Sequence, residues 1–119
     1  MAEQQRVSMH TNPTREMPAL RRQSLVREVN EQIQRLSERI DGDGMLVVLC
    51  ECGDPECLLR LTIPRDEYDA VRSAPTRFIA TKEHGVGEHV VAARDGYVVV
   101  EKSGPGALRA VELDPRRTR

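Results

Sequence analysis

The chain has 119 residues, with 18 basic and 19 acidic side chains and a formal net charge of −1. This length predicts one domain, and the balance of charge gives no overall attraction to nucleic acid or to anionic lipid. No stretch approaches the roughly 18 apolar residues of a membrane-spanning helix, and the N-terminus lacks the apolar centre of a signal peptide. We therefore expect a cytoplasmic protein with no membrane span.

Aromatic residues are scarce, with no Trp, one Phe and two Tyr. A short chain with so few large side chains can bury only a modest hydrophobic core. A structural metal ion would compensate, because the free energy of binding the ion contributes to folding. Size and composition therefore favour a metal-stabilised fold.

Residues 1–18 are polar, contain Pro13 and Pro18, and show no periodicity. They are predicted to form a disordered tail.

Residues 19–42 are predicted to form an amphipathic helix that ends at Gly42. Its apolar residues recur at steps of three and four and form one seam: Val26, Val29, Ile33, Leu36 and Ile40. The seam spans about two heptads, fewer than an independent coiled coil needs. We expect the seam to pack on its own domain, and the alternative is a protein partner or a homodimer through this helix.

All three cysteines of the chain fall within the segment Cys50–Cys57. Cys50 and Cys52 stand two apart, so on an extended chain their sulfurs point to the same side but about 7 Å apart. Tetrahedral zinc needs sulfurs about 3.8 Å apart. The backbone must therefore curl, and Gly53 with the Asp-Pro pair after it supplies a turn that returns Cys57 to the same point.

Such a turn is a poor place for buried apolar residues, so the cluster predicts a Zn²⁺ site. Inert core thiols and redox-active thiols are the alternatives. An odd number of cysteines without an export signal argues against a disulfide framework.

The remaining elements predict an α+β domain over residues 43–114, with a small, mostly antiparallel sheet. Strands at 45–49 and 57–63 would form a hairpin with the metal turn at its tip, and a short helix is expected at 65–74. Further strands are expected at 77–81 and 97–101, the latter after an Asp-Gly hairpin turn. Residues 89–93 and 107–113 fit either helix or strand, residues 82–88 form a loop, and residues 115–119 form a basic tail.

The fourth ligand is open between two histidines. His84 lies in a glycine-containing loop, whereas His89 begins an apolar run, and loop geometry favours His84. A carboxylate could replace either one, because Asp and Glu also bind zinc. The candidates are Glu83, Asp54 and Glu56.

Several segments together resemble a small uncharacterised bacterial domain family: Val29–Ile33, the Cys-x-Cys-x4-Cys cluster, Glu67–Arg72, Arg77-Phe78, His84 and Gly96–Lys102. The resemblance covers roughly residues 28 to 116. It implies that His84 is the fourth ligand, although Glu83 stands where the family pattern has glycine. It implies no activity.

Four protein ligands leave zinc no open position to activate water, and the sequence has no P-loop, dinucleotide-binding motif, deaminase signature or nucleophile elbow. We therefore expect a non-enzymatic zinc-binding interaction or regulatory module with metal ligands Cys50, Cys52, Cys57 and His84. The alternatives are a zinc-thiolate redox sensor and a transcription-associated nucleic-acid-binding protein. Arginines on the helix and at the C-terminus support the last alternative only weakly, because acidic residues are interspersed with them.

Overall fold

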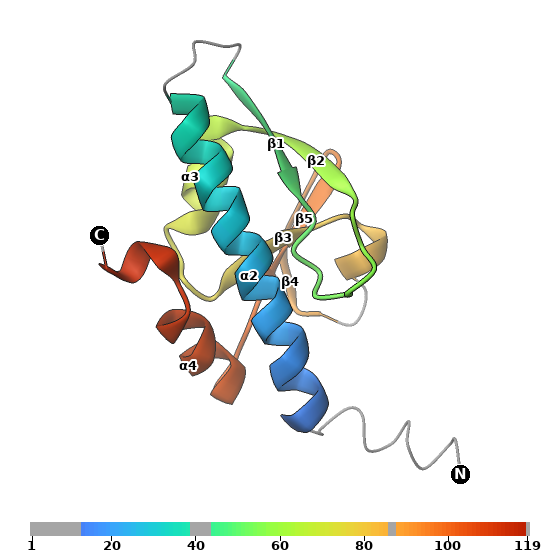
Figure 1. Ribbon diagram of the computed structural model, residues 1–119. Coiled ribbons are helices and arrows are strands. Elements are labelled where there is room, and N and C mark those ends of the chain that lie inside the picture. The colour runs from blue at the N-terminus through green and yellow to red at the C-terminus, as the bar shows by residue number, and fades with distance from the viewer. Residues whose placement is uncertain (1–12, 39–43, 86–87, 119) are drawn as a thin grey trace.

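The computed structural model describes residues 13–38, 44–85 and 88–118. It confirms the α+β class, with an N-terminal helix, small antiparallel sheets and further short helices (Figure 1). The elements in chain order are α2 (Pro13–Glu38), β1 (Met45–Leu49), β2 (Arg60–Pro64), α3 (Arg65–Arg72), β3 (Arg77–Ala80), the 3-10 helix η1 (Glu83–Gly85), β4 (Val90–Arg94), β5 (Tyr97–Glu101), α4 (Gly104–Glu112) and the 3-10 helix η2 (Pro115–Thr118). Among the described residues, no helix is both long and apolar enough to cross a bilayer.

The strands form two sheets rather than one. β1 and β2 make an antiparallel hairpin in which Leu46 faces Ile63 and Val48 faces Leu61. The second sheet has the order β3-β5-β4, again antiparallel, with an irregularity in β4 between Val90 and Ala92. The predicted hairpin is therefore confirmed, and it is a separate two-stranded layer.

Side chains that alternate along β3 and β5 fill two cores on opposite faces of the three-stranded sheet. On one face lie Ile79, Tyr97 and Val99, which pack with the inward residues of the hairpin and with α3. On the other face lie Phe78, Val98 and Val100, which pack with residues of α2 and α4. Cys50 belongs to this second cluster, with Cys52 and Cys57 packed against its edge. The cysteines therefore lie beside a core that α2 and α4 help to enclose.

Helix α2 packs on the domain through its polar face, contrary to the expectation that the apolar seam would do so. Figure 1 shows α2 running beside β1, with α4 also against it. Its buried residues are almost all polar: Leu20, Gln23, Ser24, Arg27, Asn30, Glu31 and Gln34. In the predicted seam, Val29 and Leu36 are exposed, Val26 and Ile33 are partly buried, and Ile40 lies outside the described residues.

Five of the buried polar side chains of α2 bond to the backbone or side chains of neighbouring elements, which is why they can face inward: Gln23, Arg27, Asn30, Glu31 and Gln34. Asn30 accepts a hydrogen bond from the Leu49 N–H and donates to the Leu49 carbonyl, so it covers the free edge of β1. Arg27 donates to the carbonyls of Pro75 and Ala110 and lies over the Phe78 ring at 4.3 Å. Burial lowers the pKa of Arg27. Helix propensity and periodicity cannot anticipate partners so distant in sequence.

Two boundaries differ from the sequence prediction. Helix α2 begins at Pro13 rather than at residue 19, so residues 13–18 of the predicted disordered tail are helical. Proline suits the first position of a helix, because its missing N–H has no acceptor there. Residues 1–12 lie outside the described part of the chain. The second strand begins at Arg60 rather than at residue 57.

The predicted basic tail is in fact packed against the domain. Arg116 donates to Glu31 at 2.9 Å and to Asp69 at 2.8 Å, and Arg72 bridges Glu31 and Asp114. Glu31 is fully buried, and its Oε2 atom also accepts a hydrogen bond from the Tyr68 hydroxyl at 3.1 Å. Burial alone would raise the pKa of Glu31, but the hydrogen bonds and charges of Arg116 and Arg72 outweigh it, so the pKa is lowered. This network joins α2, α3 and η2.

Candidate metal site

The structure brings the four predicted metal-site residues together. Cys50, Cys52, Cys57 and His84 each offer one ligand atom, and these four atoms all lie within 4.8 Å of one another. The Nδ1 atom of His84 lies 3.2 Å from the Cys57 sulfur and 3.7 Å from the Cys50 sulfur. The group could hold a metal ion.

The spacing suits a tetrahedral ion. With Zn–S near 2.3 Å and Zn–N near 2.0–2.1 Å, tetrahedral geometry places an imidazole nitrogen about 3.6 Å from each sulfur and the sulfurs about 3.8 Å apart. The two nitrogen–sulfur distances fall on either side of the ideal of about 3.6 Å. The widest separation within the group, at most 4.8 Å, exceeds the ideal sulfur–sulfur distance by no more than about 1 Å. A small contraction of the side chains would complete the site.

The end of β1 fixes the first ligand. The Cys50 N–H donates to the Leu59 carbonyl at 2.9 Å, which continues the hairpin pairing up to the turn. The Cys50 sulfur accepts the Thr81 N–H at 3.3 Å, just after β3. The Thr81 carbonyl also accepts a hydrogen bond from the backbone N–H of His84 at 3.1 Å, which shapes η1. The residue after β3 therefore orients both a sulfur and the imidazole, as second-layer groups do in metal sites.

Glu51 points away from the ligand atoms and into the domain. Because adjacent side chains on an extended chain face opposite ways, a residue between two ligand cysteines is directed inward. Its carboxylate accepts the Asn30 amide at 2.8 Å and the Ile79 N–H at 3.0 Å. Burial raises its pKa to about 7, although these hydrogen bonds oppose the shift. Glu51 thus ties the metal turn to α2 and β3.

Gly53 gives the turn its curl and lets it lie against α2. Its φ is +84°, a conformation that other residues rarely adopt. Its carbonyl accepts the Arg22 guanidinium at 2.9 Å, and the neighbouring Glu51 carbonyl accepts the Gln23 amide at 3.2 Å. A Cβ at this position would lie 2.9 Å from both the Ala19 carbonyl oxygen and the Gln23 side chain. Only glycine fits both the dihedral and the space.

Replacing Gly53 with alanine is therefore expected to destabilise the zinc-loaded protein by about 2–3 kcal/mol, through backbone strain and displacement of α2. Gly96→Ala is the matched control, because Gly96 also has positive φ, +94°, but a Cβ there meets nothing within 4 Å. Urea unfolding in excess zinc measures the free energy of unfolding of both variants. An equal decrease of this free energy in the two would show that the contact with α2 contributes nothing.

Burial dominates the ionisation of the thiols. It raises the pKa of Cys50 to about 12, with the neighbouring sulfurs adding to the shift and the Thr81 N–H opposing it. Burial also raises the pKa of Cys52. Without a cation these thiols are therefore protonated at neutral pH, and a bound divalent ion supplies the charge that thiolates need.

The other proposed ligands are not part of this group. His89 is exposed just before β4, and the three carboxylate candidates, Glu83, Asp54 and Glu56, are also outside it. Asp54 instead accepts the Glu56 N–H through its side chain and the Cys57 N–H through its carbonyl, which closes the turn. Sequence reasoning missed the supporting roles of Thr81 and Glu51. Only the inward direction of Glu51 could have been inferred, from its place between two cysteines.

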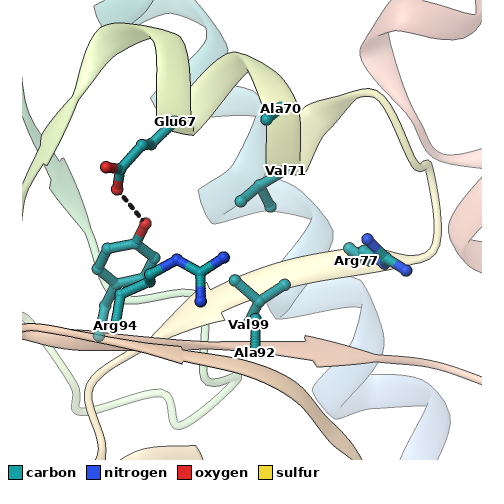
Figure 2. A pocket seen from close by; sticks show the side chains of 8 residues that line it. Glu67, Ala70, Val71, Arg77, Ala92, Arg94 and Val99 are labelled. Carbon is teal, nitrogen blue, oxygen red and sulfur yellow. Dashed lines mark hydrogen bonds between the residues drawn. The ribbon is translucent and has the colours of Figure 1, made fainter.

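A separate cavity lies on the other face of the three-stranded sheet. Figure 2 shows it between α3 and the strands. Two of its lining residues are joined by a hydrogen bond, which the Tyr97 hydroxyl donates to Glu67 at 2.6 Å. Its volume is about 140 Å³, well below the roughly 300–1,000 Å³ of typical small-molecule sites. The Cys50, Cys52, Cys57 and His84 group is the candidate functional site because its four ligand atoms are placed so that they could hold an ion.

Comparison with known proteins adds no relative to this chain. No protein-family model, curated protein or solved structure matches it, so the family resemblance described above stays a prediction.

Proposed function

We propose that this chain is a non-enzymatic zinc-binding module, of the interaction or regulatory kind, in which the ion is structural. The supporting observation is the convergence of three thiols and one imidazole to within 4.8 Å of one another. Sulfur-rich tetrahedral sets of this kind prefer zinc among the abundant divalent ions. Four protein ligands leave zinc no open position for water or substrate, so the proposed site is closed to catalysis.

The position of the site supports a structural role. The three cysteines occupy the tip of the β1–β2 hairpin, and His84 lies in η1, between β3 and β4. An ion held by all four would link the two sheets at a point where hydrogen bonds to α2 also converge. Because the ligands belong to segments that are apart in the unfolded chain, binding the ion favours the folded state.

Metal analysis of the purified protein tests this proposal. We expect about one zinc per chain in the wild type and less than about a tenth of that in His84→Ala, because a three-ligand site binds more weakly. His89→Ala is the matched control and should retain wild-type zinc. Wild-type protein that contains no zinc after supplementation, or equal zinc in both variants, would rule out the proposed site.

A redox role is the second candidate, and the accessibility of the site favours it. Cys52 and Cys57 are only partly buried, and their sulfurs are close enough to form a disulfide after a small movement. Hydrogen peroxide would oxidise one thiolate to a sulfenic acid and be reduced to hydroxide. A second thiolate would then attack the sulfenic sulfur and displace a further hydroxide, which forms the disulfide and releases zinc. Reversible zinc release at moderate peroxide concentrations is the expected result. Retention of zinc would exclude this role.

A further inference from the structure

The outer face of α2 carries an apolar stripe. Leu25, Val29 and Leu36 are 56%, 48% and 59% exposed, respectively. They recur at steps of four and seven, so they share one side of the helix, where Gln32 fills the gap between Val29 and Leu36. At 100° per residue this side is directly opposite the buried polar face. The helix thus directs its polar side chains inward and large aliphatic ones outward.

Large exposed apolar residues gathered on one face are typical of interaction surfaces. The charges beside the stripe indicate which partner fits. Glu28 and Arg35 are both exposed, seven residues apart on the same edge of the stripe. Neither one makes a hydrogen bond or ion pair within the part of the chain that the structure describes. Because Glu28 and Arg35 lie one heptad apart on the same edge, a second copy of the helix that runs the opposite way brings each charge beside its opposite.

A second copy of α2 lying antiparallel would cover the apolar stripe and would also pair the charges beside it. With the two-fold axis between residues 30 and 31, Leu25 of each copy meets Leu36 of the other. Val29 then meets Gln32, and Glu28 comes beside Arg35 on both sides of the axis. The half-buried Val26 and Ile33 face each other on the opposite edge of the stripe. A parallel pair would instead place Glu28 beside Ile33 and leave both charges unpaired.

We propose that this protein forms a two-fold symmetric dimer through antiparallel pairing of the outer face of α2, centred between residues 30 and 31. The inference rests on the proposed function in treating the chain as an interaction module, and it identifies the partner as a second copy. It does not use the metal ligands. The interface and the metal site can therefore fail independently.

Sedimentation equilibrium of the full zinc-loaded chain over a wide concentration range tests the dimer. The single variants Glu28→Arg and Arg35→Glu should each weaken dimerisation by about tenfold or more, since each creates two like-charge contacts across the axis. The double variant E28R/R35E should return to within about threefold of the wild type. Arg60→Glu, the same change at an exposed position on β2, is the matched control and should dimerise normally.

Mixing the two single variants gives the sharper result. Only in the antiparallel arrangement does a Glu28→Arg chain meet an Arg35→Glu chain with both charge pairs attractive. The mixture should therefore form heterodimers at least as well as the wild type, while each variant alone stays mostly monomeric. A second readout, zinc content, should be unchanged in all these variants.

Three outcomes would overturn the inference. The first is a wild-type chain that stays monomeric at every concentration. The second is a dimer whose dissociation constant does not change on charge reversal. The third is a mixture of the two single variants that dimerises no more tightly than either variant alone. If any of these occurs while the zinc content stays at about one per chain, the inference fails and the proposed function stands. Loss of zinc from the wild type would instead contradict the proposed function.

Discussion

Removing zinc from the full chain with a strong chelator is expected to lower its thermal unfolding midpoint by on the order of 15 °C or more. A ligand that binds only the folded state stabilises it by about 4 kcal/mol at 1,000 times its dissociation constant. In a domain of this size, each kcal/mol corresponds to roughly 4 °C. The hairpin tip and η1 meet at Cys50, Cys52, Cys57 and His84, so without an ion the proximity of these segments depends on a small core.

Circular dichroism melting in zinc and in chelator measures this change. Adding zinc back should restore the higher midpoint, and His89→Ala should respond as the wild type does. His84→Ala should melt at the lower temperature under both conditions. Identical curves for the wild type with and without chelator would show that no ion contributes to the fold.

Replacing Glu31 with glutamine is expected to destabilise the protein by about 3–5 kcal/mol, because it leaves two arginines facing a neutral amide. Arg72 and Arg116 each donate to Glu31 at 2.9 Å, and the carboxylate is fully buried. Urea unfolding in excess zinc measures the change. Glu112→Gln is the matched control: its ion pair with Arg109 is exposed and should contribute less than about 1 kcal/mol.

The effect of this substitution should depend on pH. The folded state lowers the pKa of Glu31 below its ordinary value of 4.5. Its ionised form therefore contributes stability that is fully present above the unfolded-state pKa and is lost as the pH falls through the folded-state pKa. The difference in unfolding free energy between the wild type and Glu31→Gln should be constant above about pH 6 and should shrink below about pH 4. A difference that grows on acidification would contradict the assignment.

The candidate site could be predicted from the sequence because most of it is local. Three of the four group members lie within Cys50–Cys57, and the spacing, the glycine and the Asp-Pro pair together require a compact turn. Strands β1, β3 and β5 could be predicted for the same reason, since their apolar patterns are short-range and turn signals bound them. The choice of His84 over His89 required loop geometry and a resemblance, and the structure places only His84 beside the sulfurs.

Other features depend on contacts that only the folded chain makes. Residues 89–93 and 107–113 fit either state in sequence. In the structure β4 pairs with β5, and α4 packs against α2. The C-terminal arginines were predicted to form a free tail, but the buried carboxylate of Glu31 holds Arg116. Arg116 and Glu31 are 85 residues apart in the chain, so no local pattern encodes their contact.

By itself, the sequence determined the metal-site turn, the principal strands and the existence of a long N-terminal helix, since each depends on residues close together along the chain. Only the tertiary structure decided which face of that helix turns inward. Periodicity ranks faces by hydrophobicity. Here the inward face is chosen by the hydrogen bonds that Arg27 and Asn30 donate to distant carbonyls and by the one that Glu31 accepts from Arg72. A buried polar face is stable only when every such partner is in place, and that condition belongs to the assembled fold.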